Sequence, residues 1–246
     1  MSSAPLFSDR ADAGERLAQS LLTLVAQLKD SGIGASPIVY ALPRGGIPIA
    51  VPVARQLNCP LDIVVAKKIT TPKNPELAVG AIDSEGQVLW SRQLALGIKN
   101  SNWRETALRE AQAKAQSQLE QLSSGRPSVN PEGALALLID DGIATGMTIV
   151  AAAQAIKAHK PEQLWICAPV APVGIIQWLT QWCDRVVILE TPEPFLSVSR
   201  FYVEFPQVDT QEALIELQHH NHLTTQRQTL EIRSERGSET DKADLS

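Results

Sequence analysis

Short, nearly continuous apolar runs alternate with helical patterns along most of the chain. The apolar runs lie at residues 38–42, 61–66, 134–139, 164–170 and 185–190. Apolar spacing predicts helices at 10–30, 46–57, 103–122, 147–159 and 173–182. Strands that are apolar on both faces and separated by helices indicate a parallel sheet covered on both sides. The pattern therefore predicts an α/β fold with a parallel sheet of about five strands.

Two regions depart from this alternation. Residues 70–76 contain two prolines and little apolar surface, which predicts a loop, and residues 79–90 predict a hairpin that projects from the sheet. Residues 219–246 are polar and mixed in charge, so they cannot bury enough apolar surface to offset the entropy of ordering. We therefore predict a single domain over residues 1–218 and a disordered tail over residues 219–246.

Composition narrows the class of protein. Hydrophobic residues make up 44% of the chain and charged residues 20%, which is an ordinary globular balance. The net charge of −5 and the lack of a basic run argue against a nucleic-acid-binding surface. The three cysteines are far apart, with neither a disulfide framework nor zinc-ligand spacing, so a reducing cytoplasm is expected. Neither a signal peptide nor an apolar run of the ~20 residues that a membrane span needs is recognisable.

The stretch "LLIDDGIATGMT", residues 137–148, places two neighbouring carboxylates directly after an apolar strand. Asp140 and Asp141 repel each other there, and desolvation makes the repulsion worse. The residues that follow open a helix, whose first backbone amides attract a phosphate. Thr145 and Thr148 add hydroxyl donors, and Gly146 lets a ligand approach the backbone closely. Helix capping by Asp141 or Thr145 is the alternative, but it explains one such residue and not the whole set.

Two common phosphate motifs do not fit this stretch. A Walker-type loop needs four residues between its glycines and then a lysine, but three residues separate Gly142 from Gly146, and Met147 stands where the lysine would be. The G-x-G-x-x-G pattern is absent as well.

The same twelve residues closely resemble the phosphoribosyl-diphosphate (PRPP) binding motif of type I phosphoribosyltransferases. In that family the two acids hold the ribose 2′- and 3′-hydroxyls, and the turn holds the 5′-phosphate. The resemblance implies that Asp140 and Asp141 bind the ribose and, through its hydroxyls or water, help to hold Mg²⁺. It implies that the phosphate is bound by Ala144, Thr145, Gly146, Met147 and Thr148.

A second segment, "ALPRGGIPIAVPVARQL" at residues 41–57, supports this resemblance. Arg44, Gly45 and Gly46 follow a strand and open a helix, so they can present a cation and bare backbone amides to an anion. The segment looks like the diphosphate-binding loop of the family, which in several members contains a non-proline cis peptide. That bond is expected here at Pro43–Arg44 or an immediate neighbour. The alternative is an ordinary turn with a surface arginine.

Two lysines end the next predicted strand. Adjacent side chains in a strand point to opposite faces, so only one of Lys67 and Lys68 is expected beside the diphosphate. We favour Lys68, which lies nearer the tip, and a solvated lysine remains the alternative for either. Residues 69–78 and the hairpin stand where the family has a mobile catalytic loop that excludes water, with Asn74 and Glu76 as candidate participants. A surface loop without chemistry is the alternative.

Residues 7–218 as a whole resemble a bacterial group described as predicted phosphoribosyltransferases. The resemblance implies a Rossmann-like open sheet with a projecting hairpin, a flexible loop and a small hood. It implies a pentosyltransferase of nucleotide metabolism or salvage, in which a nitrogenous base displaces diphosphate from PRPP in a Mg²⁺-dependent reaction. Its partners would be PRPP and a base, without nucleic acid or membrane, and family members often form homodimers. Catalytic roles are implied for Asp140, Asp141, Arg44 and Lys68, with Lys67, Gly45 and Gly46 binding substrate.

The acceptor base is the least determined part of this hypothesis. Hypoxanthine–guanine members carry an acid where this chain has Ala144, which argues against that kind of 6-oxopurine chemistry. The acceptor pocket is expected between residues 168–172 and the C-terminal segment, where Phe195, Phe201 or Tyr202 could stack on a base or else belong to the core. Two other functions stay open: a non-catalytic regulator that senses PRPP, and a phosphosugar hydrolase.

Overall fold

The computed structural model describes residues 5–71, 74–91 and 103–243. Its main sheet has five parallel strands in the order β2-β1-β6-β7-β8, as the alternation of apolar runs and helices predicts. These strands are β1 (Pro37–Ala41), β2 (Leu61–Ile63), β6 (Leu135–Ile139), β7 (Gln163–Val170) and β8 (Arg185–Glu190). All five side chains of β6 are buried, which places this strand at the centre of the core.

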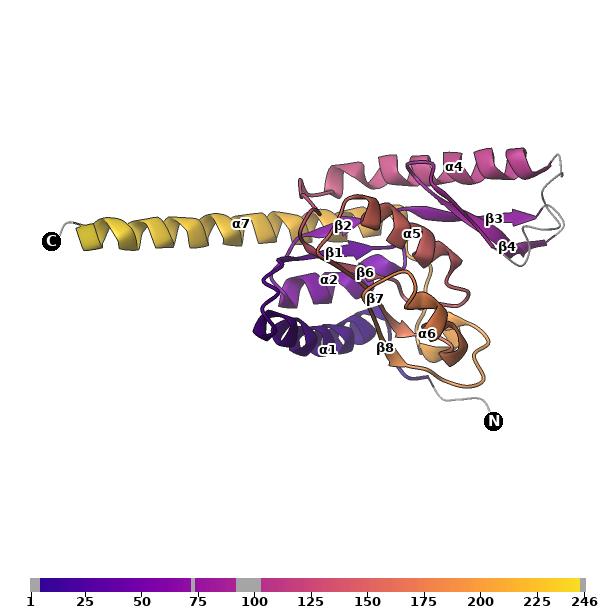
Figure 1. Cartoon of the computed structure of the whole chain (residues 1–246), viewed down its shortest axis with the longest axis horizontal. Coiled ribbons are helices and arrows are strands. Elements are labelled where there is room, and N and C mark those ends of the chain that lie inside the picture. Colours follow the sequence, from indigo (N-terminus) through magenta and orange to yellow (C-terminus); the bar gives the residue numbers. More distant parts are fainter. Residues whose placement is uncertain (1–4, 72–73, 92–102, 244–246) are drawn as a thin grey trace.

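Helices cover both faces of the main sheet (Figure 1). One face packs against α1 (Arg10–Asp30) and α2 (Gly46–Gln56), and the other against α5 (Met147–Ala158) and α6 (Val173–Leu179). Alternate residues of β6 belong to different layers: Leu137 packs with α1 and α2, whereas Leu138 packs with α5. This two-sided burial is the physical reason why β6 is apolar at every position and the other strands of this sheet are mostly apolar.

A second, antiparallel sheet projects beside the main one (Figure 1). It consists of β3 (Ala66–Thr71), β4 (Asn74–Asp83) and β5 (Val88–Trp90), and α4 (Trp103–Leu122) packs on it. The predicted hairpin over 79–90 is confirmed. The predicted strand over 61–66 is two strands, because β2 ends at Ile63 and β3 starts in the other sheet.

The prediction of a loop over residues 70–76 is wrong for the described part of that range. Thr70 and Thr71 continue β3, and β4 begins at Asn74. Pairing here is irregular, since Thr70 pairs with Ala78 and Thr71 with Asn74, and the register shifts between them. Such a bulge admits a proline-containing stretch without a regular hydrogen-bond ladder.

Residues 219–246, expected to be disordered, lie in helix α7 (Thr210–Ala243) as far as Ala243. Polar side chains anchor the part of this helix where the predicted tail begins. The Asn221 side chain accepts from the Leu61 N–H (3.1 Å) and donates to the Leu61 carbonyl (2.8 Å), and the His220 ring lies 3.0 Å from the Cys59 carbonyl. Hydrophobic patterning cannot detect such contacts, because they satisfy backbone groups instead of burying apolar surface. The far end of α7 extends away from the body (Figure 1).

Two short 3-10 helices complete the described elements: η1 (Ser123–Gly125) and η2 (Val198–Phe201). None of the helices in the described part of the chain combines the length and the apolar character that crossing a membrane requires.

Candidate functional site

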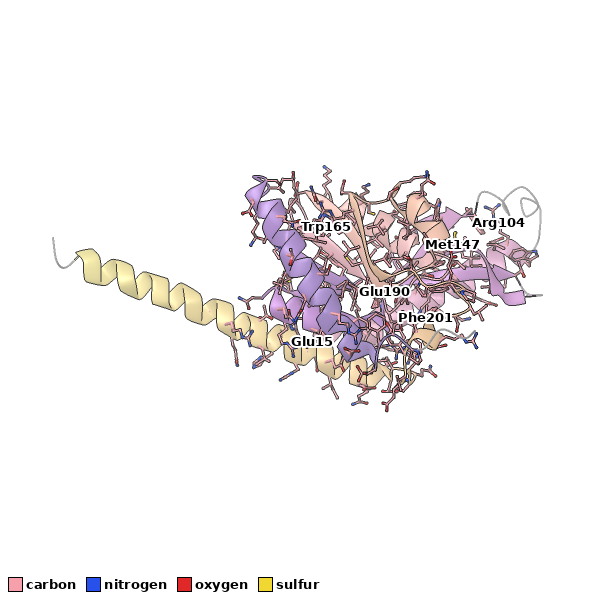
Figure 2. All side chains as sticks on the ribbon, turned by 90° about the horizontal axis from the view of Figure 1, so that it is seen from below. Glu15, Arg104, Met147, Trp165, Glu190 and Phe201 are labelled. Atoms are coloured by element: carbon pink, nitrogen blue, oxygen red, sulfur yellow. The ribbon has the colours of Figure 1, made fainter. Side chains whose placement is uncertain are left out.

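The two motifs found separately in the sequence meet at the carboxyl edge of the main sheet. Strands β1 and β6 are neighbours and end level, with Ala41 opposite Ile139. Figure 2 shows Met147, at the start of α5, and Glu190, at the end of β8, toward the same end of the molecule. In an open parallel sheet, this edge is where ligands bind.

Glycines allow the loop after β1 to touch the end of β6. A Cβ atom at Gly46 would lie 2.7 Å from the Ile139 carbonyl oxygen, and a Cβ atom at Gly45 would overlap the carboxylate of Asp141. Any larger residue would push the two loops apart. Glycine is therefore required at both positions, so that residues 43–46 can lie against the neighbouring carboxylates Asp140 and Asp141, the acid pair.

The turn after the acid pair forms the wall of a cavity of about 180 Å³. Gly146 begins α5 with a φ of +75°, and a Cβ atom there would lie 2.5 Å from the Trp178 ring. Ala144 and Thr145 are exposed, and the side chain of Met147 is buried in the core, so only its backbone can reach a ligand. Of the predicted site residues, the cavity brings together Lys68, Asp140, Ala144, Thr145, Gly146 and Thr148.

Asp140 presents its half-buried carboxylate to this cavity. One of its oxygens accepts a hydrogen bond from the backbone N–H of Asp141 (2.9 Å). Burial raises the pKa of Asp140 well above its usual range, and the neighbouring Asp141 carboxylate raises it further, while Lys68 and Arg10 oppose both effects. A cation or a hydroxyl donor that entered the cavity would relieve this unfavourable charge.

Asp141 is engaged differently, by a cation from the start of the chain. Both Nε and Nη2 of Arg10 lie 2.9 Å from Asp141 Oδ2, and the Tyr202 hydroxyl donates to the Asp141 carbonyl (2.6 Å). Burial raises the pKa of Asp141, and the charge and hydrogen bond of Arg10 counteract that shift. Asp141 does not line the cavity. The sequence interpretation did not identify Arg10, because no local pattern connects it to a residue 131 positions away.

Arg44 lies on the loop that the glycines hold in place. The Pro43–Arg44 peptide is cis, as the resemblance implied. Arg44 Nη1 donates to Thr210 Oγ1 (2.8 Å) at the start of α7. Arg44, Gly45 and Gly46 therefore lie beside the acid pair, but none of them lines the small cavity.

The two lysines of β3 differ as the strand alternation predicts. Lys68 is exposed and lines the cavity with Asp140. Burial lowers the pKa of Lys67, and the charges of Arg44 and Lys114 lower it further. The charge of Arg44 therefore reaches Lys67. The side chains of Asn74 and Glu76, the candidate participants from the predicted loop, lie outside the described residues.

The candidate acceptor aromatics are not equivalent. Phe201 and Tyr202 are almost fully buried in the core, so the prediction that either stacks on a base is not supported. Phe195 is half-buried, packs 5.1 Å from the Phe201 ring, and lines a shallow hollow of about 590 Å³ with Val173 and Glu193. A larger groove of about 910 Å³ lies elsewhere, between α7 and residues 124–129.

A family model described as "Phosphoribosyl transferase domain" matches residues 9–174, which is more than half of the 246 residues. The chain belongs to the phosphoribosyl transferase domain family. The match includes the acid pair with its turn, the Arg44 loop and Arg10. The matched range thus contains the residues that the geometry brings together at the edge of the sheet.

Known relatives of this phosphoribosyl transferase domain agree with the match. Proteins from two strains of Mycobacterium tuberculosis, whose names assign them provisionally as phosphoribosyl transferases, are 36% identical over 210 residues. The alignment covers 85% of this chain and 46% of each relative, so the chain spans about half the length of the curated relatives it matches. The crystal structure of TT1426 from Thermus thermophilus is 30% identical, with a TM-score of 0.71 over 87% of this chain and 98% of that one.

The side chains of this phosphoribosyl transferase domain fit a magnesium ion that binds together with a substrate. Within the described ranges, no three His, Cys, Asp or Glu side chains gather into a group that could hold a metal. Magnesium is usually bound by one or two carboxylates and by substrate phosphates, without a protein cage. The Asp140 carboxylate suits that mode, because it lies beside residues 144–148, the predicted phosphate-binding turn (the phosphate turn).

Proposed function

We propose that this phosphoribosyl transferase domain displaces diphosphate from PRPP with a nitrogenous base in a Mg²⁺-dependent reaction. The observation that carries the proposal is one cavity lined by an acid, a lysine and the first turn of α5. Each wall suits a different part of PRPP. The helix amides and the Thr145 and Thr148 hydroxyls suit the 5′-phosphate, and the Asp140 carboxylate suits a ribose hydroxyl.

The leaving diphosphate would be bound by the cations beside this cavity. Lys68 lines the cavity, and Lys67 and Arg44 lie close enough for their charges to interact. Positive charge grows on the sugar while negative charge leaves with diphosphate, so fixed cations stabilise the transition state more than the ground state. When bound, Mg²⁺ would supply further neutralisation of the diphosphate oxygens. The chain's own contribution is therefore orientation and electrostatic stabilisation, without a covalent nucleophile.

The acceptor is proposed to be a base that needs no acid after the phosphate motif. Ala144 is exposed at that position and offers neither a proton donor nor an acceptor side chain. The hollow beside Phe195 is the proposed acceptor region, since it lies on the segments that follow β7 and β8. The Phe201 ring packs against part of the Phe195 ring, so stacking on a base would use the remaining surface of Phe195.

Diphosphate release tests this proposal. The protein is incubated with PRPP, Mg²⁺ and a panel of nitrogenous bases, and release is expected only when a particular base is present. Asp140→Asn should abolish that release, whereas Asp30→Asn, at the exposed end of α1, should leave it unchanged. Release without any base would instead support a hydrolase. Binding of PRPP without turnover across the panel would support a sensor.

PRPP affinity is expected to fall as the pH rises, and the fall should begin at a lower pH than the usual pKa of a lysine would give. Only one of the two lysines was expected beside the diphosphate, with Lys68 favoured, but the charge of Arg44 reaches Lys67, so we propose that protonated Lys67 also binds the diphosphate. Burial and Arg44 lower the pKa of Lys67. Affinity should therefore be highest below this pKa and weaken as the pH rises through it. Calorimetric titration between about pH 7 and 10 measures the effect. Lys67→Arg should flatten the profile because a guanidinium stays charged. Lys29→Arg, at the exposed end of α1, is the control; an unchanged profile in Lys67→Arg would contradict the assignment.

A further inference from the structure

Arg10 uses its whole guanidinium group at the edge of the candidate site. Its Nε and Nη2 contact Asp141 Oδ2, each at 2.9 Å, and its Nη1 donates to the Pro206 carbonyl (2.7 Å). The guanidinium carbon lies 3.6 Å from the centre of the Phe205 ring. The Arg10 side chain is 10% exposed and that of Asp141 is 16% exposed, so solvent screens this ion pair weakly.

Backbone pairing between the two ends of the domain holds this arrangement in place. Phe7 and Tyr202 form a parallel bridge, the Val203 N–H donates to the Phe7 carbonyl (2.9 Å), and the Glu204 N–H donates to the Ser8 carbonyl (2.8 Å). The N-terminal segment thus brings Arg10 to the side chain of Asp141. The C-terminal segment brings the Tyr202 hydroxyl to the carbonyl of the same residue.

The Asp141 carboxylate lies between Arg10 and Gly45, which belongs to the loop of residues 43–46 that carries Arg44 (the Arg44 loop). A Cβ atom at Gly45 would overlap the Asp141 carboxylate and would come within 3.5 Å of Arg10 Nε. The ion pair therefore packs directly under the loop that carries Arg44. Asp140, the other member of the acid pair, lines the cavity while Asp141 does not.

We infer that Arg10 is a positioning residue of the PRPP site, a conclusion that rests on the proposed function. By holding Asp141 Oδ2 against Gly45, Arg10 fixes the Arg44 loop relative to the end of β6. The two acids then have different tasks. Asp140 is the acid that lines the cavity, and Asp141, besides its expected place at the ribose, transmits the position of Arg10 to the diphosphate loop.

A double-mutant cycle tests this inference with PRPP and Mg²⁺ as the probe and the dissociation constant as the readout. Arg10→Gln and Asp141→Asn should each weaken binding by roughly 10- to 100-fold. If Arg10 acts through Asp141, adding Arg10→Gln to Asp141→Asn should weaken binding by no more than about 3-fold further. Arg10→Lys, which keeps the charge but not the fork of donors, should lie between wild type and Arg10→Gln.

Arg16→Gln is the matched control, because Arg16 lies on the same helix, pairs with Asp12 and stacks over the Phe7 ring. It should leave the dissociation constant unchanged. Thermal unfolding of every variant separates lost folding from lost positioning, and Arg10→Lys completes the cycle should Arg10→Gln fail to fold. If Arg10→Gln weakened binding equally in the wild type and in Asp141→Asn, or if Arg10→Gln bound PRPP normally, the inference would be overturned while the proposed function would stand. Absence of PRPP binding by the wild-type protein would overturn the proposed function and the inference together.

Discussion

Asp140→Asn is expected to weaken PRPP binding by roughly 10- to 150-fold while leaving the protein at least as stable as the wild type. Asparagine keeps the shape of the side chain and can still accept from the Asp141 N–H, but it loses the charge. A hydrogen bond to a charged group contributes about 1.5–3 kcal/mol, and that contribution disappears. Calorimetric titration with PRPP and Mg²⁺ measures the loss.

The stability of this variant should change in the opposite direction. Burial and the Asp141 carboxylate raise the pKa of Asp140, so the ionised side chain destabilises the folded state at neutral pH. A neutral residue removes that penalty, and the unfolding temperature should stay equal or rise. Asp30→Asn should change neither quantity. Normal PRPP binding by Asp140→Asn, or by the double variant Asp140→Asn with Asp141→Asn, would show that the ribose assignment is wrong.

Gly146→Ala is expected to destabilise the fold by about 2–4 kcal/mol and to displace the phosphate turn. The backbone of Gly146 has a φ of +75°, which is unfavourable for alanine, and the new Cβ would lie 2.5 Å from the Trp178 ring. Relief of that overlap must move either the indole or the turn that begins α5. PRPP affinity should therefore fall together with the free energy of unfolding, measured by urea titration.

Gly32→Ala separates the two causes of this effect. Gly32 also has a positive φ, of +92°, but a Cβ atom there would meet nothing within 4 Å. It should therefore cost only the backbone penalty, about 1–2 kcal/mol, with unchanged PRPP affinity. If Gly146→Ala proved no more harmful than Gly32→Ala in both measurements, the close packing of the turn against Trp178 would be refuted.

Elements with a local signal could be predicted from the sequence. Helices α1 and α4 begin and end where apolar spacing places them, because one face of each packs against a sheet or a neighbouring helix. The strands of the main sheet were recognisable because burial on both faces makes them nearly continuous apolar runs. The phosphate turn was recognisable for a related reason: its acid pair, glycines and threonines occupy one continuous stretch.

Features that depend on distant pairs could not be predicted in this way. Asn221 holds α7 against the backbone of Leu61, and Arg10 contacts Asp141, a residue 131 positions away in the sequence. The split of residues 61–66 into β2 and β3 is decided by which sheet each half pairs with, not by the hydrophobicity of the run. The different surroundings of Asp140 and Asp141 could not be predicted either. Both are aspartates in one motif, and only the structure shows that Asp140 lines the cavity while Asp141 pairs with Arg10.

A crystal structure with PRPP and Mg²⁺ bound tests the central claim most directly. The account predicts the 5′-phosphate within about 2.7–3.2 Å of the backbone amides of residues 144–148, with a ribose hydroxyl at the Asp140 carboxylate. The Arg10–Asp141 pair should remain intact beneath the diphosphate. A phosphate bound in the groove along α7 instead, or an Asp140 side chain with no contact to the sugar, would contradict the account.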